Sequence, residues 1–384
     1  MKKKLLLMAM TSVALASCVN EEVVETQNVQ EKAKIIFDMP VMYDKADSRA
    51  NVYGELGPAV VGEHYMYPNT EQFVVYVINH TNQFTSWSDG TEWGFNGQPI
   101  SYEGTTHAWA PIKDDGSYYY WPAGYLSFAA TSPAVLEQAQ DWDGRSYGDS
   151  GLKLENYVVG KDLDKQIDVL FSERILNQSN ASNIGQTTTN PNTAYNGIPI
   201  QFKHALSSVH FAIQNELAMT TDITLTSITI EGVYGTGSFN QNLDQTTGPS
   251  WIAESSSSRN YEAFTGKLLF PYSERHVAKY AAEDTDASDE NEKAYSLLLL
   301  PQTFSANSKI VIKYTIEGDT NVFTKEVYFN DSGKEINLNQ SAWEIGKRYL
   351  YLIKYSKETQ ADDMILFAPS VEGWQEEATI VIEL

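Results

Sequence analysis

The sequence predicts an all-β protein built from β-sandwiches, and three observations lead to this fold class. Apolar and polar residues alternate with a period of two along most patterned segments, which is typical of half-buried strands. These segments are rich in Val, Ile, Thr, Tyr and Phe, and turn signals such as Asp-Gly and Asn-Gly separate them. Apolar residues make up 42% of the chain and aromatic residues 12%, which is ample for a packed core. Many short strands with few helices favour sandwiches.

The alternating segments follow one another along the whole chain. Strand candidates include residues 34–42, 72–79, 125–130, 207–213, 223–233, 264–270, 295–300, 309–317, 321–329, 347–355 and 378–384. One short helix is expected over residues 133–142, with Ser132 as its cap and Pro133 at its first position. Residues 177–196 are rich in Asn, Ser and Thr, so we interpret them as a long loop near a domain boundary.

The N-terminus has the organisation of an export signal. Three lysines follow Met1, and a run of roughly a dozen mostly apolar residues comes next, too short for a transmembrane helix. Leu15-Ala16-Ser17-Cys18 contains the only cysteine of the chain and resembles the lipobox of bacterial lipoproteins. That resemblance implies cleavage after residue 17 and a lipid on Cys18 that holds the chain at the outer membrane. The alternative is a plain signal peptide with an incidental cysteine.

The negative charge of the chain argues against nucleic acid and anionic lipid as partners. Loss of residues 1–17 removes three lysines, which takes the formal charge from −23 to −26. Such an acidic chain argues against nucleic acid, whose phosphates need a basic surface, and against docking of the protein body on anionic lipid. An acidic cluster of Glu21, Glu22 and Glu25 resembles the surface-export signal of lipoproteins in Bacteroidota, although it could equally be a solvated tether.

No motif calls for catalysis or for a cofactor. Gly148-Asp149-Ser150-Gly151 resembles the nucleophile motif of chymotrypsin-like proteases, but Leu152 replaces its next glycine, and a turn between two strands explains it better. His204 and His210 lie six residues apart on one expected strand, and no third metal ligand accompanies them. We therefore expect no enzyme, no metal site and no cofactor.

Aromatic residues crowd the first half of the chain. Such side chains bind the faces of sugars, but they also fill the cores of sandwiches, and we favour the core interpretation. The sugar interpretation keeps open an alternative function, that of a surface glycan-binding lipoprotein. The residues concerned are Trp87, Trp93, Trp109, Trp121 and Trp142, with Tyr118, Tyr119 and Tyr120.

Four blocks in a fixed order resemble the fimbrillin family, the pilins of type V pili in Bacteroidota. The resemblance implies two tandem transthyretin-like β-sandwich domains with Greek-key connections, which would occupy residues 50–197 and 198–384. It also implies a non-enzymatic subunit of a cell-surface fimbrium that serves adhesion, with other fimbrial subunits as partners and a receptor on a host or bacterial surface. The blocks are Tyr118–Pro122 with Leu126–Phe128, Phe202–Ser207, Leu297–Gln302, and Trp343–Tyr351 with Pro369–Trp374.

The same resemblance implies that an arginine-directed protease removes the first strand. The strand to be displaced lies in residues 33–42, where Ile35, Phe37 and Met39 alternate with other residues and predict one face turned to a core. Arg49 is the first arginine of the chain and lies in a polar segment of the kind that proteases cut. We therefore expect scission between Arg49 and Ala50, which would make residues 18–49 a lipidated propeptide. The alternative is a surface arginine in an ordinary loop.

Residues 378–384 offer a strand that could replace the one removed. They place Ala378, Ile380, Ile382 and Leu384 on one face, and we hypothesise that this segment fills the groove of a neighbouring subunit. Head-to-tail insertion does not close on itself, so it would generate a filament. The segment could instead be the last core strand of its own domain. Shaft, tip and anchor positions in the fimbrium all remain open.

Overall fold

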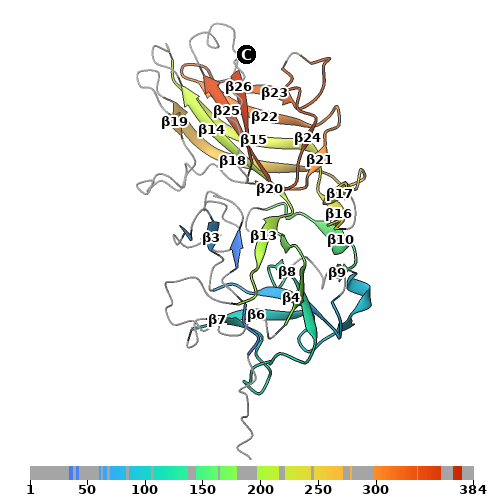
Figure 1. Cartoon of the computed structure of the whole chain (residues 1–384). Helices are drawn as coiled ribbons and strands as arrows, with labels where there is room; N and C mark the ends of the chain where they lie inside the picture. Colours follow the sequence, from blue (N-terminus) through green and yellow to red (C-terminus); the bar gives the residue numbers. More distant parts are fainter. Residues whose placement is uncertain are drawn as a thin grey trace, which may run out of the picture.

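The structure, a computed structural model, is all-β in the part of the chain that it describes (Figure 1). It describes residues 34–37, 40–42, 60–61, 64–66, 70–83, 86–104, 108–136, 144–162, 165–179, 197–215, 221–243, 246–270, 277–278, 297–334, 336–355 and 366–373. These ranges contain no α-helix, and η1 (Trp87–Asp89) is a single 3₁₀ turn. The expected all-β class is therefore confirmed.

The first sheet has eleven strands and occupies the lower part of Figure 1. Its main path runs β2-β3-β1-β13-β11-β8-β4-β6-β7, and β12 and β5 branch from β8 and β4. The strands are β1 (Val41–Met42), β2 (Val60–Val61), β3 (His64–Met66), β4 (Phe73–His80), β5 (Thr91–Glu92), β6 (Gln98–Glu103), β7 (Ala108–Ala110), β8 (Tyr125–Ser132), β11 (Leu170–Ser172), β12 (Ile175–Gln178) and β13 (Gln201–His204).

The two central strands of this sheet, β4 and β8, are buried on both faces. Phe73, Val75 and Val77 of β4 point into the main core of the sheet. Ile78 packs on the other side, in a smaller cluster with Trp87 of η1. Because both faces are covered, these strands read as nearly continuous apolar runs rather than as strict alternation.

A second sheet joins segments from the two halves of the chain. Its order is β17-β16-β10-β9, formed by β9 (Arg145–Gly148), β10 (Gly151–Val158), β16 (Thr236–Asn240) and β17 (Ser250–Ala253). Its strands therefore come from both sides of residue 197, and the division of the chain at that residue stays a prediction. The Gly148-Asp149-Ser150-Gly151 motif is the turn between β9 and β10, with Gly148 and Gly151 paired. The interpretation of that motif as a turn is confirmed.

Two further sheets face each other in the upper part of Figure 1 and enclose most of the largest core, which continues to β10, β11 and β16. One contains β14 (Ser207–Asn215), β19 (Val277–Ala278), β20 (Leu297–Leu299), β25 (Lys347–Tyr355) and β26 (Leu366–Gly373). The other contains β15 (Ile223–Tyr234), β18 (Ser258–Phe270), β22 (Lys309–Ile316) and β23 (Phe323–Tyr328). A two-stranded ribbon of β21 (Gln302–Thr303) and β24 (Ala342–Trp343) accompanies them.

Three polar side chains in this second core are linked by hydrogen bonds. The Trp343 indole N–H donates to the Tyr351 hydroxyl over 2.9 Å, and that hydroxyl donates to the side-chain carbonyl of Gln340 over 2.6 Å. Burial raises the pKa of Tyr351 because it disfavours the charged phenolate. Tyr351 is therefore a neutral structural link between strands, and buried polar groups satisfied in this way stabilise one particular packing.

The helix expected over residues 133–142 is not present in its first part. Residues 133–136 continue from β8 in an irregular conformation, and residues 137–143 lie outside the described ranges. The guanidinium of Arg145 donates to the carbonyls of Pro133 and Ala134 over 2.8 and 2.6 Å. These carbonyls thus accept hydrogen bonds from the Arg145 side chain, whereas in a helix they would accept them from backbone N–H groups of the next turn.

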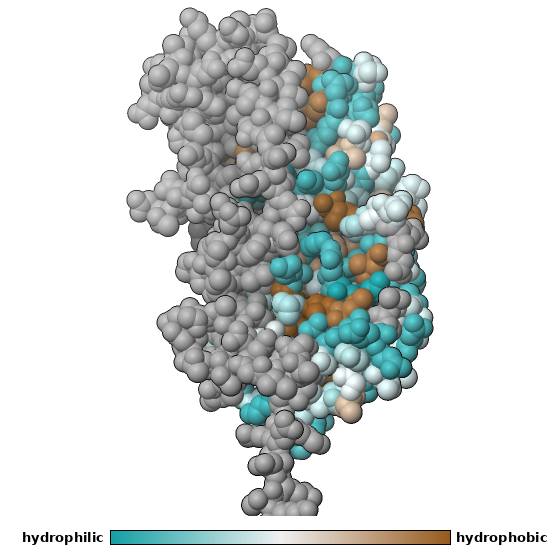
Figure 2. Space-filling model, viewed as in Figure 1, coloured by the Kyte–Doolittle hydropathy of each residue, from teal (hydrophilic) through white to brown (hydrophobic). Residues whose placement is uncertain are grey.

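The surface of the described part is polar with scattered apolar residues. On the face that Figure 2 shows, brown residues form small patches among teal ones. The large apolar side chains with most exposure come from different elements of the fold: Ile112, Tyr120, Val135, Ile252, Leu269 and Val322. Isolated residues of this kind are normal on protein surfaces and indicate no binding site by themselves.

The carboxylate of Asp149 predicts a pH-dependent contribution to stability. It accepts hydrogen bonds from the Ser88 backbone N–H (2.7 Å) and the Ser86 hydroxyl (3.0 Å), which tie η1 to the β9–β10 turn. The hydrogen bond from the Ser88 N–H is the main cause that lowers the pKa of Asp149 below its ordinary 3.8. This stabilisation is present above the unfolded-state pKa and is lost as the pH falls through the folded-state pKa. We expect Asp149→Asn to lower the melting temperature at pH 7 by about 1–2 °C.

Calorimetry across pH checks this expectation. The difference between the wild-type chain and Asp149→Asn should shrink as the pH falls through 4 toward 2. A difference that is the same at pH 7 and pH 3 would contradict the assignment.

Candidate functional site: a strand that closes the first sheet

Residues 34–37 form a short strand between two parts of the first sheet, and we call it the closing strand. On one side the Ile35 N–H donates to the Tyr119 carbonyl over 2.9 Å, and the Phe37 N–H donates to the Trp109 carbonyl over 2.7 Å. On the other side the Ile198 N–H donates to the Ile36 carbonyl over 3.1 Å. Its pairing is antiparallel to Trp109 and parallel to Ile198.

These hydrogen bonds join β7, at one end of the main path, to the segment just before β13. Trp109 lies in β7, the last strand of the main path, and Ile198 lies just before β13. Further along, β1 continues beside β13 in parallel, with Val41 opposite Gln201. The strands from β13 through β11, β8, β4, β6 and β7 thus form a ring that the closing strand completes. Without this strand, backbone groups of β7 and of the segment before β13 would lack these partners, and the strand pairs with both.

The sequence predicts three inward side chains in this segment, and the structure describes two of them. Ile35 and Phe37 have no exposed surface, Ile36 is half-buried and Lys34 is exposed. Met39, the third predicted inward position, lies outside the described residues. The burial expected for Ile35 and Phe37 is therefore found.

Phe37 lies at the centre of an aromatic cluster. Its ring meets those of Phe73, Phe95 and Phe128 edge to face, with centroids 6.0, 6.3 and 5.6 Å away and interplanar angles of 88–89°. Each such arrangement stabilises by about 0.5–1.5 kcal/mol beyond the burial of area. The three rings come from β4, from the turn before β6 and from β8, so three elements converge on one side chain.

The other end of the closing strand contacts the loop before β8. The Lys34 ammonium lies 3.9 Å from the centroid of the Tyr118 ring, a cation–π contact. The Tyr118 hydroxyl in turn donates a hydrogen bond to the Glu103 carboxylate. The strand is thus held by backbone pairing, by apolar packing and by one charged contact.

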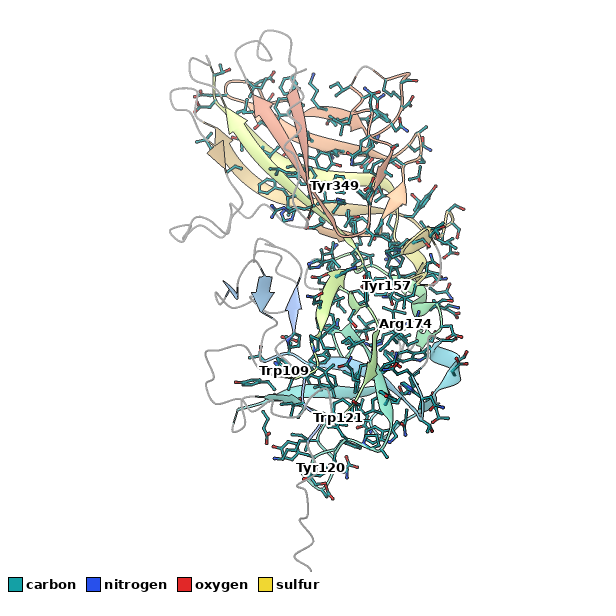
Figure 3. The ribbon with its side chains drawn as sticks, viewed as in Figure 1. Trp109, Tyr120, Trp121, Tyr157, Arg174 and Tyr349 are labelled. Carbon is teal, nitrogen blue, oxygen red and sulfur yellow. The ribbon has the colours of Figure 1, made fainter. Side chains whose placement is uncertain are left out.

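Most of the crowded aromatic residues belong to the core. Trp87, Trp109 and Trp121 are buried, as the core interpretation expects, and Trp142 lies outside the described residues. Figure 3 shows Trp109 and Trp121 within the lower part of the molecule and Tyr120 near its lower end. Tyr120 is 38% exposed. A shallow hollow lies close to it in sequence, lined by Gln98, Lys113, Asp114, Asp115 and Tyr119.

The histidine pair does not form a metal site. His204 ends β13 and His210 lies in β14, so the expectation of a single strand is wrong. The His204 ring nitrogen Nδ1 lies 2.8 Å from an Asp168 carboxylate oxygen, and His210 Nε2 lies 2.5 Å from the Ser208 hydroxyl. The described residues contain no group of three His, Cys, Asp or Glu side chains that could hold a metal ion.

The described residues also contain no helix that is long and apolar enough to span a membrane.

Several sequence-predicted sites lie outside the described residues and stay predictions. These are Cys18, Arg49 and Ala50, together with Ala378, Ile380, Ile382 and Leu384. Sequence reasoning also missed the partners of the closing strand, Trp109, Tyr119 and Ile198. Their contribution is made by backbone atoms, for which a sequence carries no local signal.

The fold and this site define a class of chain: an all-β protein whose first sheet is completed by a segment from near its N-terminus. A family model described as fimbrillin-like matches residues 67–374. The chain therefore belongs to the fimbrillin-like family, which places it among the subunits of cell-surface fimbriae. No curated protein sequence matches the chain significantly.

Solved structures that resemble this chain come from Bacteroides species. A candidate cell adhesion protein of Bacteroides uniformis is 14% identical, with a TM-score of 0.48, and the match covers 91% of this chain and 100% of that one. A second, from Bacteroides ovatus, is 12% identical, with a TM-score of 0.48 and coverage of 90% and 100%. A fimbrial protein of Bacteroides ovatus is 12% identical, with a TM-score of 0.34 and coverage of 85% and 50%. The family assignment rests on the sequence match alone.

Truncation of Phe37 tests how far the first sheet depends on the closing strand. We expect Phe37→Ala to lower the free energy of unfolding of this sheet by about 3–5 kcal/mol, because it leaves a cavity among three rings. The matched control is Ile112→Ala, whose side chain is 40% exposed and should cost less than about 0.5 kcal/mol. Urea denaturation followed by tryptophan fluorescence measures both variants. Equal costs for the two would mean that the closing strand is not part of the stable core.

Proposed function

We propose that this chain is a fimbrial subunit that assembles by donor-strand exchange and serves adhesion at the cell surface. One observation carries the proposal. Residues 34–37 supply two fully buried side chains and both edge pairings of the first sheet, yet they precede the first arginine of the chain. A cut at that arginine would turn a core strand into a separate fragment.

Loss of this strand would leave the first sheet incomplete in two ways. The carbonyls of Trp109 and Tyr119 and the N–H of Ile198 would lose their partners, and unpaired buried groups of this kind cost about 1–3 kcal/mol each. The pocket now filled by Ile35 and Phe37 would also open to water. An extended strand from another subunit can satisfy both needs, because it brings backbone groups for the edges and side chains for the pocket.

Export and maturation follow from the N-terminal sequence. In this proposal residues 1–17 direct export, a lipid on Cys18 anchors the precursor in the outer membrane, and an arginine-specific protease cuts between Arg49 and Ala50. Residues 18–49 carry seven acidic and four basic residues, so their loss takes the formal charge from −26 back to −23. The mature subunit would contain no cysteine, and the lipid would hold the chain only until assembly.

The segment that we propose as the donor is residues 378–384, with Ala378, Ile380, Ile382 and Leu384 on its inward face. Donation from one subunit to the next is head to tail and does not close, so it produces a filament. If these residues instead stay in their own domain, the chain would suit a tip position, where no donor is needed. Other fimbrial subunits and a surface receptor are the partners in either case.

A second candidate function, glycan binding at the cell surface, has one observation in its favour. The exposed ring of Tyr120 lies next in sequence to Tyr119, which lines a hollow with Gln98, Lys113 and the carboxylates of Asp114 and Asp115. Aromatic faces together with polar hydrogen-bonding groups are the usual components of a sugar site. Glycan binding does not require loss of the first strand, so the two functions differ in what they predict at Arg49.

Proteolysis of the purified precursor separates the two functions. Incubation with an arginine-specific protease should give a new N-terminus at Ala50 and laddered polymers on unheated gels, because an opened groove recruits donor strands. Arg49→Gln is the matched control and should remain uncut and monomeric. N-terminal sequencing and the gel give the two readouts.

Three results would change the assignment. Resistance at Arg49 together with polysaccharide binding would favour the glycan binder. A chain that is cut but stays monomeric would favour a tip subunit over a shaft subunit. Polymers formed equally well by Arg49→Gln would contradict the role of the cut.

A further inference from the structure

We propose that the shallow hollow beside Tyr119 binds a single neutral sugar unit, a pyranose ring at the end of a glycan. Such a site would serve the second candidate function, glycan binding, on which it rests, and it adds the residues and the class of sugar. The volume of the hollow is about 340 Å³. Ligand pockets commonly measure about 300–1,000 Å³, so a hollow of this size suits one sugar unit rather than a long stretch of chain. It is lined by Gln98, Lys113, Asp114, Asp115 and Tyr119.

One side of the hollow is a tight hairpin over residues 112–118. The Lys113 N–H donates to the Ser117 carbonyl over 2.9 Å, and the Gly116 N–H donates to the Lys113 carbonyl over 2.8 Å. The Asp115 carboxylate accepts hydrogen bonds from the N–H and the hydroxyl of Ser117, over 2.9 and 2.6 Å. These hydrogen bonds hold the hairpin in one conformation, so a ligand would not have to order it on binding.

The turn that leads into β6 forms a second side. The Gly97 N–H donates to the Val75 carbonyl over 2.8 Å, and the Val77 N–H donates to the side-chain carbonyl of Asn96 over 2.8 Å. Both hydrogen bonds tie the turn to the central strand β4. Gln98 follows this turn directly, and its exposed side chain therefore extends from a fixed backbone.

Tyr119 contributes the aromatic surface. Its ring packs against those of Phe95 and Trp93, with centroids 5.1 and 6.1 Å away and interplanar angles of 61°. The Lys113 ammonium lies 5.1 Å from the centroid of the same ring. The next residue, Tyr120, lies near the lower end of the molecule, away from the upper sandwich (Figure 3). The hollow thus combines a fixed ring with a positive charge beside it.

The polar side chains of the hollow keep hydrogen-bonding capacity for a ligand. Within the described residues, the side chains of Asp114 and Gln98 form no hydrogen bond. Both hydrogen bonds from Ser117 to the Asp115 carboxylate end on one oxygen atom. Carboxylates accept hydrogen bonds, an ammonium group donates them, and an amide does both. Sugar hydroxyl groups also donate and accept, so they match this mixture of groups.

The charges of the hollow select the class of sugar. Its lining contains two carboxylates and one ammonium group, a formal sum of −1, and the whole chain carries −23. An acidic sugar or a phosphate would therefore be repelled. An apolar ligand would leave the carboxylates and the amide without partners. A neutral pyranose avoids both costs, because its hydroxyl groups pair with the polar side chains while its C–H face packs on the Tyr119 ring.

The test uses the full, uncut chain and saturation-transfer NMR. The probes are the methyl pyranosides of glucose, galactose and mannose, each compared with the uronate in which a carboxylate replaces the C6 hydroxymethyl group. We expect at least one neutral glycoside to bind with a dissociation constant on the order of 1 mM, as suits a small ligand in a shallow site. Its uronate should bind about tenfold more weakly or not at all, because of the negative charge around the hollow.

Two variants locate the binding. Asp114→Ala and Gln98→Ala should each weaken binding of the neutral glycoside by about tenfold, since each removes a hydrogen-bonding group. Both side chains are exposed, so the melting temperature should not change. The matched control is Asp89→Ala, which removes an exposed carboxylate outside the hollow and should leave binding unchanged.

Each outcome supports or overturns a distinct part of the proposal. Binding of a neutral glycoside that Asp114→Ala and Gln98→Ala weaken and Asp89→Ala does not supports the site. Binding that all three variants retain overturns the site and leaves glycan binding elsewhere on the surface. A uronate that binds more tightly than its neutral partner overturns the class of sugar. If no probe binds, the site and the second candidate function both fail, while the fimbrial function, tested at Arg49, is unaffected.

Discussion

The first sheet depends on one side chain and its backbone: Phe37, packed among three phenylalanine rings while its N–H pairs with Trp109. The hydrophobic contacts and the edge pairing act together, because Ile35 and Phe37 both fill the pocket with their side chains and pair with neighbouring strands through their N–H groups. Removal of this segment would expose apolar rings and unpaired carbonyls at once. A core built in this way is complete only with a strand in that place, whichever chain supplies it.

The closing strand contributes side chains to the core of the first sheet and to no other described core. The largest core lies between the two upper sheets and continues to β10, β16 and Phe171 of β11, and it contains no residue of the closing strand. In this region β14 and β25 pair in parallel over eight residue pairs. Hydrogen bonds also link the side chains of Trp343, Tyr351 and Gln340. The sheet of β9, β10, β16 and β17 connects the two regions. The proposed exchange would therefore remove residues from the core of the first sheet and from no other described core.

Local patterns in the sequence predicted the long strands well. The expectations for β4, β8, β14, β15, β22 and β25 agree with the structure to within about two residues at each end, because these strands have strong apolar patterns. The strands β6, β7, β16 and β17 were missed, since few residues carry a pattern there and their partners are remote. The eight-residue strand β10 was also missed, because a bulge between Leu154 and Tyr157 interrupts its alternation, and β18 was predicted only from residue 264. For the site, alternation alone predicted that Ile35 and Phe37 are buried. It could not predict Trp109 or Ile198 as partners, because their backbone atoms pair across large sequence separations. The helix expected over residues 133–142 is absent over residues 133–136, where the side chain of Arg145 binds two of the carbonyls.

The central claim is that residues 34–37 are a replaceable part of the first sheet. Hydrogen–deuterium exchange at the amide of Ile198 tests it most directly, because that N–H donates to the Ile36 carbonyl and so reports on what occupies the groove. The account predicts slow exchange in the precursor, fast exchange after the N-terminal fragment is cut and removed, and slow exchange again in the assembled polymer. An Ile198 amide that stays equally protected in all three states would contradict it.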